Sequence, residues 1–146
     1  MPTAARLAGA IVFAVFGLYI ALLSTGVFPN ERAPTYWYPL LAFVGLVIGW
    51  RFCGGRAGKG YVASVSLGIT TTLCFVFWVA FLVGMVRMIE KAMDMEYNGP
   101  VAAIMNVFVE MSAFAEDMYD VNLIINLVVG GIIGAFLVEI VARRLP

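Results

Sequence analysis

Four long apolar stretches constrain the fold of this chain more than any other feature of its sequence. They cover residues 7–24, 37–50, 61–86 and 121–138, and charged or glycine-rich segments separate them. A helix needs about 20 apolar residues to cross the hydrocarbon of a bilayer, at about 1.5 Å per residue. With 63% hydrophobic and 12% charged residues, the chain is too apolar for an ordinary soluble domain. We therefore expect an all-α membrane protein with four transmembrane helices.

The four predicted spans belong to one domain, a single transmembrane helical bundle of residues 1–146. The second stretch is short unless its aromatic ends lie at the membrane interface, where Trp and Tyr side chains prefer to sit. The first is long for the apolar region of a secretory signal, so we expect it to be retained as a span. The predicted spans are residues 7–24, 37–52, 61–86 and 121–141.

The charged residues between the spans are sorted by side. If the N-terminus is cytoplasmic, six of nine cations lie at cytoplasmic ends and eight of nine acids lie on the periplasmic side. Cytoplasmic loops of membrane proteins carry an excess of Lys and Arg. The sequence therefore predicts a multi-pass protein of the bacterial inner membrane with both termini cytoplasmic. The cations at the cytoplasmic ends are Arg6, Arg51, Arg56, Lys59, Arg143 and Arg144, and the acids on the opposite side are Glu31, Glu90, Asp94, Glu96, Glu110, Glu116, Asp117 and Asp120.

Residues 101–118 form an amphipathic segment rather than a fifth span. Val101, Ile104 and Phe108 recur at helical spacing, whereas Glu110 and Asp117 fall on the opposite face. Carboxylates on one face are costly in a helix exposed to lipid. We expect an additional interfacial helix on the periplasmic side, with its acids forming a solvated face.

Small residues predict where the helices pack. Gly45 and Gly49 form one GxxxG pattern and Gly130 and Gly134 form another, and such patterns allow close approach of two backbones. Asn126 precedes Gly130 by one turn and can hydrogen-bond to a neighbouring helix. The patterns are compatible with packing inside one chain and with a homo-oligomer.

Methionine is unevenly distributed, with seven of eight between positions 85 and 118. Thioethers are soft ligands that favour Cu(I), so Met85, Met88, Met93 and Met95 form a candidate metal site at the periplasmic face. The alternative is that flexible methionines fill gaps where the amphipathic segment packs on the bundle.

Glu139 is the one acid in the cytoplasmic half of the last span, and Arg143 follows it at i+4. This spacing predicts an ion pair on one helix face. The alternative is proton or ion handling, which a carboxylate inside a membrane can perform.

Catalytic motifs are not apparent. The chain contains no histidine, which excludes His triads, His proton shuttles and His-ligated metals, and neither cysteine lies in a CxxC pattern. We expect no enzyme activity and no cofactor. The basic loops suit anionic lipid headgroups better than nucleic acid, which requires a larger basic surface.

Several segments resemble the TrgA family of small bacterial inner-membrane proteins. They are Met-Pro-Thr-Ala-Ala-Arg-Leu at 1–7, Gly-Trp-Arg at 49–51, Arg-Ala-Gly-Lys-Gly-Tyr at 56–61, Tyr-Asn-Gly-Pro-Val at 97–101 and Glu-Ile-Val-Ala-Arg-Arg at 139–144.

The resemblance extends over essentially the whole chain and implies a non-enzymatic role in resistance to tellurite, with which the family is associated. Two other functions remain open: an accessory subunit of a larger membrane complex, and a soft-metal binding or transport protein that uses the methionines. The expected partners are the lipid bilayer and either a second copy of the chain or another membrane protein.

Overall fold

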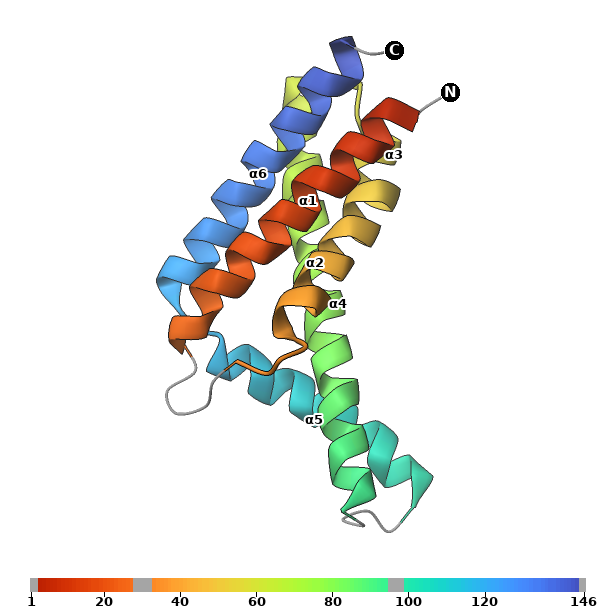
Figure 1. Cartoon of the computed structure of the whole chain (residues 1–146), viewed down its shortest axis with the longest axis vertical. Coiled ribbons are helices and arrows are strands. Elements are labelled where there is room, and N and C mark those ends of the chain that lie inside the picture. The colour runs from red at the N-terminus through yellow and green to blue at the C-terminus, as the bar shows by residue number, and fades with distance from the viewer. Residues whose placement is uncertain (1–2, 28–32, 95–98, 145–146) are drawn as a thin grey trace.

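The computed structural model describes residues 3–27, 33–94 and 99–144, and every regular element within them is helical. The protein is therefore all-α, as the apolar stretches predict (Figure 1). The helices are α1 (Thr3–Ser24), α2 (Trp37–Ile48), α3 (Gly54–Arg56), α4 (Tyr61–Met93), α5 (Pro100–Asp117) and α6 (Val121–Arg144), with a 3-10 turn at Thr25–Val27 and a π-helical turn at Gly49–Cys53.

Four helical segments are long and apolar enough to cross a membrane, which makes this a multi-pass membrane protein. The second of them, Trp37–Arg56, extends four residues beyond the predicted end at residue 52. The π-helical turn after α2 continues directly into α3, because Gly49 and Gly54 both keep helical backbone angles. The other three segments are Ala4–Ser24, Tyr61–Met93 and Val121–Arg144.

The long helices form a bundle whose two ends differ in charge. Figure 1 shows the described ends of α1 and α6 that adjoin the termini at the same end of the bundle, beside α3. We call this the basic end, because it carries six cations: Arg6, Arg51, Arg56, Lys59, Arg143 and Arg144. Helix α5 runs across the opposite end, which we call the acidic end, and packs against the part of α4 that extends beyond the other spans.

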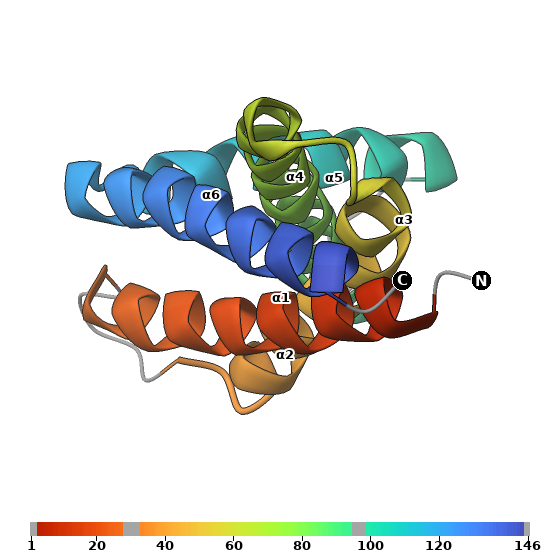
Figure 2. The ribbon, with the colours of Figure 1, turned by 90° about the horizontal axis from the view of Figure 1, so that it is seen from above.

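Helix α1 lies between α2 and α6, and glycines allow close packing against α2 (Figure 2). A Cβ atom on Gly45 would collide with the backbone carbonyl of Phe13, and one on Gly49 would collide with the backbone of Gly9. Gly45 and Gly49, which the sequence singles out for helix packing, thus lie in backbone contact with α1.

The glycines of α6 face two different neighbours. A Cβ on Gly130 would meet the Phe16 ring at 2.6 Å, and Gly134 also lies against α1. Gly131, which the GxxxG pattern omits, lies against α4, where a Cβ on Gly68 would approach the Gly131 carbonyl oxygen to 2.8 Å. Asn126 accepts a hydrogen bond from the Tyr19 hydroxyl at 2.9 Å, which joins α6 to α1.

Candidate functional site

The most constrained polar site surrounds Glu139 at the basic end, where the side chain is buried with the residue 1% exposed. Its Oε2 atom accepts a hydrogen bond from the Gly58 backbone N–H at 2.5 Å. Its Oε1 atom accepts from the Gly60 N–H at 2.9 Å and from Arg143 Nε at 2.9 Å. We refer to Glu139, Gly58, Gly60 and Arg143 as the Glu139 clasp. It ties the segment between α3 and α4 to α6.

The backbone of the two glycines explains why this segment can meet a carboxylate. Gly58 has a φ of +96° and Gly60 a φ of +113°, conformations that side-chain-bearing residues rarely adopt. The Arg143 guanidinium carbon lies 4.5 Å from the centre of the Tyr61 ring, so the same arginine also contacts the first residue of α4. The predicted partners Glu139 and Arg143 are in contact, and the geometry favours a structural role because three donors occupy the carboxylate.

A second charged cluster lies at the acidic end, between α4 and α5. Glu110 of α5 is only 7% exposed and accepts a hydrogen bond from Lys91 Nζ at 2.5 Å. Arg87 Nη1 lies 3.6 Å from the other oxygen of Glu110, and its Nη2 lies 3.8 Å from Asp117 Oδ2. We refer to Arg87, Lys91, Glu110 and Asp117 as the α4–α5 charge cluster.

The prediction that the acids of this segment form a solvated face is wrong for Glu110. This residue faces α4, whereas Val101, Ile104 and Phe108 are exposed, Phe108 at 63%. The reason is that α4 extends beyond the other spans and presents Arg87 and Lys91 to α5, so a buried carboxylate gains two partners. The apolar stripe of α5 is left facing outward, as in a helix that lies in a membrane interface.

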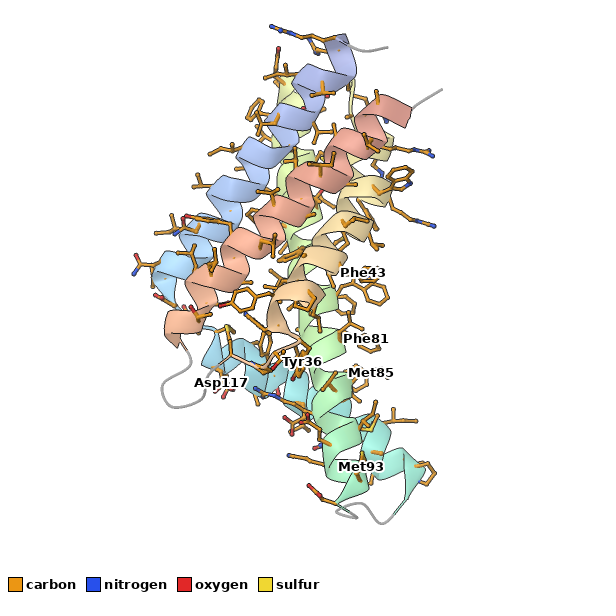
Figure 3. All side chains as sticks on the ribbon, in the orientation of Figure 1. Tyr36, Phe43, Phe81, Met85, Met93 and Asp117 are labelled. Atoms are coloured by element: carbon orange, nitrogen blue, oxygen red, sulfur yellow. The ribbon has the colours of Figure 1, made fainter. Side chains whose placement is uncertain are left out.

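The pKa values of Glu110 and Tyr36, both at the acidic end, differ from their usual values. The hydrogen bond from Lys91 lowers the pKa of Glu110, and the charges of Lys91 and Arg87 add to this against the opposing effect of burial. The pKa of Tyr36, at the same end of the bundle, is raised by burial and by the nearby charge of Glu90. Figure 3 shows Tyr36 and Asp117 at this end. Glu110 is therefore ionised at neutral pH and holds both cations.

The three candidate metal ligands that the structure describes are spread along one helix. Met85 and Met93 lie on α4 (Figure 3), Met88 lies between them in the same helix, and Met95 lies outside the described residues. Met93 follows Met85 by eight positions, which corresponds to about 12 Å along the helix axis. Met93 is 78% exposed. Within the described ranges, no group of three or more His, Cys, Asp or Glu side chains could hold a metal ion.

The two cysteines are free thiols in apolar surroundings. Cys53 is fully buried at the end of the π-helical turn, and Cys74 is half-buried on α4.

Comparison of the chain with models of protein families, with curated proteins and with solved structures finds no match.

Proposed function

We propose that this protein is a non-enzymatic component of the bacterial inner membrane that contributes to tellurite resistance as an accessory to another membrane component. The observation that carries the accessory role is the use of the buried carboxylates. Glu110 and Glu139 are the buried acids of the described residues, and both are held by donors from neighbouring segments. The bonds of Glu110 join α5 to α4, and those of Glu139 join α6 to the segment between α3 and α4. The charged groups therefore serve the fold, which fits a scaffold better than a transport path.

The charge cluster at the acidic end argues against direct capture of an oxyanion. Arg87 and Lys91 could attract an anion, but Glu110 and Asp117 already neutralise them at ion-pair distance. An approaching tellurite ion also meets the exposed acids Glu116 and Asp94. A surface of this sign lowers the local concentration of anions. Contribution to resistance through a partner is therefore more consistent with the charges than uptake or export by this chain alone.

The thiols provide a second argument for a non-enzymatic role. Reduction of an oxyanion by a cysteine requires an accessible thiolate. Cys53 has no exposed surface, and Cys74 is half-buried on an apolar helix. Neither thiol is positioned to meet an oxyanion in water.

The proposed orientation places the basic end in the cytoplasm. This end holds the start of α1, the end of α6 and most of the cations. The clustering supports the orientation, because positively charged loops are retained on the cytoplasmic side. The α4–α5 charge cluster then lies on the periplasmic side. The TrgA resemblance of the segments quoted above supports the inner membrane and the link to tellurite.

The test is a deletion strain challenged with tellurite, with survival and cellular tellurium both measured. We expect the deletion strain to be more sensitive and to accumulate the same amount of tellurium as the parent. Complementation with the Cys53→Ala, Cys74→Ala double variant should restore survival. Unchanged sensitivity of the deletion strain contradicts a role in resistance. Lower tellurium in the parent than in the deletion strain contradicts the expected equal accumulation and indicates exclusion or efflux.

The accessory role also predicts a partner. Purification of the chain from its native membrane in a mild detergent should yield another membrane protein in constant ratio. The Glu139→Ala variant, which we expect to be destabilised, provides a control. Loss of the partner from this variant would show that partner binding depends on the folded structure of this chain. A chain that purifies alone as a homo-oligomer contradicts the accessory role.

A further inference from the structure

An open groove of about 510 Å³ lies on the surface between α2 and α4. Its walls are Phe43 and Val47 of α2, Trp78 and Leu82 of α4, and the basic end of the α2 segment supplies Arg51 and Phe52. This volume lies within the range of about 300–1,000 Å³ that is typical of small-molecule sites. The groove is therefore large enough for part of a ligand.

The groove has one charged end and one apolar end. Phe43 and Arg51 are eight residues apart, which corresponds to about 12 Å along the helix. Both side chains are exposed, as is Trp78. Figure 3 shows Phe43 and Phe81 pointing to the same side of the bundle, away from α1 and α6. A ligand that fits this arrangement combines an anionic head with an apolar chain.

Arg51 differs from Arg87 and Arg143 in having no ion-pair partner among the described residues. Arg87 and Arg143 are engaged in ion pairs with Glu110 and Glu139. Among the described residues, no acid lies within ion-pair distance of Arg51, and it faces the groove. Arg56 lies close by, with its guanidinium carbon 5.2 Å from the centre of the Phe52 ring. Arg51 is thus the cation that lines the groove, and Arg56 contacts the outer lining residue Phe52.

The position of Arg51 matches the depth of a lipid headgroup. It lies within two turns of Arg56, where the second membrane-spanning segment ends. Trp50 precedes it and is 40% exposed, and Trp side chains concentrate at the interface between hydrocarbon and headgroups. The apolar walls of the groove extend from this level into the region of the spans.

We propose that the α2–α4 groove binds an anionic phospholipid, with the phosphate at Arg51 and an acyl chain against Phe43, Trp78 and Leu82. Charge complementarity selects this occupant: an unpaired guanidinium at the headgroup level attracts an anionic head, and planar guanidinium groups bind phosphate with two parallel hydrogen bonds. The bound lipid covers the exposed aromatic side chains of α4 and fixes the basic end of α2 at the membrane surface.

The experiment uses Trp78 as a reporter in the full-length chain. The protein is reconstituted in nanodiscs in which either the phosphatidylglycerol or the phosphatidylcholine carries bromine on its acyl chains, because bromine quenches nearby Trp fluorescence. The difference between the wild type and Trp78→Phe gives the quenching at Trp78. We expect brominated phosphatidylglycerol to quench Trp78 as if it were enriched roughly fivefold over phosphatidylcholine, the ratio that corresponds to about 1 kcal/mol per surface cation.

Two variants decide whether Arg51 is responsible. Arg51→Gln should equalise the quenching by the two lipids, whereas Lys59→Gln, which removes a cation from the same end but not from the groove, should preserve the preference. Native mass spectrometry should retain one phosphatidylglycerol on the wild type and none on Arg51→Gln, at equal thermal stability. Equal quenching by both lipids in the wild type overturns the proposal, as does a preference that persists in Arg51→Gln. A dimeric mass with Trp78 shielded from both lipids also overturns it, because a second copy then occupies the groove.

Discussion

Replacement of Glu139 by alanine should destabilise the protein far more than replacement of its ion-pair partner Arg143. The Glu139→Ala change removes the acceptor of the Gly58 and Gly60 N–H groups and of Arg143 Nε. A hydrogen bond to a charged group contributes about 1.5–3 kcal/mol. Water can reach the segment between α3 and α4 once it opens, because Lys59 is exposed. We therefore take the lower limit for the two backbone bonds and expect a loss of about 3 kcal/mol.

Arg143→Ala should cost much less, because this side chain is 45% exposed. Glu139 keeps its two backbone donors and Arg143 is in contact with water, so we take the value for exposed ion pairs, about 0.2–1 kcal/mol, for this bond, and the contact of Arg143 with the Tyr61 ring adds about 0.5–1 kcal/mol. Glu139→Gln keeps the size of the side chain and one neutral acceptor, so we expect an intermediate effect. Glu116→Ala removes an exposed acid of α5 and should change stability by no more than about 0.5 kcal/mol.

The assay is unfolding of the detergent-solubilised protein in sodium dodecyl sulfate, followed by Trp fluorescence, together with the rate of tryptic cleavage after Lys59. If opening of the Glu139 clasp limits cleavage, a loss of about 3 kcal/mol should accelerate it roughly a hundredfold in Glu139→Ala. The reasoning is refuted if Glu139→Ala and Arg143→Ala have equal stability and cleave at the same rate. That result would mean that the two backbone hydrogen bonds contribute nothing.

Two further predictions concern helix packing and pH. Gly49→Leu places a side chain against the Gly9 backbone and should destabilise the protein by about 1–3 kcal/mol or more, measured by thermal unfolding, whereas Gly55→Ala, with nothing within 4 Å of its Cβ, should be neutral. Because the folded-state pKa of Glu110 is lowered, its contribution is present above the normal carboxyl pKa of about 4.3 and is lost as pH falls through the folded value. The stability difference between wild type and Glu110→Gln should therefore shrink between pH 6 and pH 3, and a difference that is independent of pH would exclude ionised Glu110 as its source.

The spans could be predicted because hydrophobicity and length together require helices in a bilayer. The predicted spans 7–24 and 121–141 lie within four residues of the ends of α1 and α6, whereas α4 continues seven residues beyond the predicted span end at residue 86. The predicted second span was too short, because Arg51 and the glycines of 54–60 resemble a loop. Glycine also permits a helix to continue, and here the helix continues through Gly49 and Gly54. Local sequence does not distinguish a loop from a continued helix at these glycines. The close packing of Gly49 against Gly9 and of Gly54 against Arg6, both on α1, determines that the helix continues.

The charged sites show where sequence reasoning reaches its limit. The Glu139–Arg143 contact follows from i+4 spacing on one helix, but the N–H groups of Gly58 and Gly60 come from a segment about 80 residues away in the chain. The pattern Gly-Lys-Gly before a helix was the sequence feature that could have indicated a backbone N–H site for the carboxylate. For Arg87, helical spacing suggests Glu90 as a partner, yet its ion pairs are with Glu110 and Asp117. The ion-pair partners of Arg87 depend on how α5 packs against α4, and local helical spacing does not determine this packing.

The account rests on the orientation of the bundle across the membrane, and cysteine labelling tests it directly. In a Cys53→Ala, Cys74→Ala background, Lys59→Cys places a thiol at the basic end and Glu116→Cys places one on α5, both at exposed positions. A membrane-impermeant maleimide applied to intact spheroplasts should label Glu116→Cys at once and Lys59→Cys only after permeabilisation. Labelling of Lys59→Cys in intact spheroplasts, or protection of Glu116→Cys, would contradict the proposed orientation.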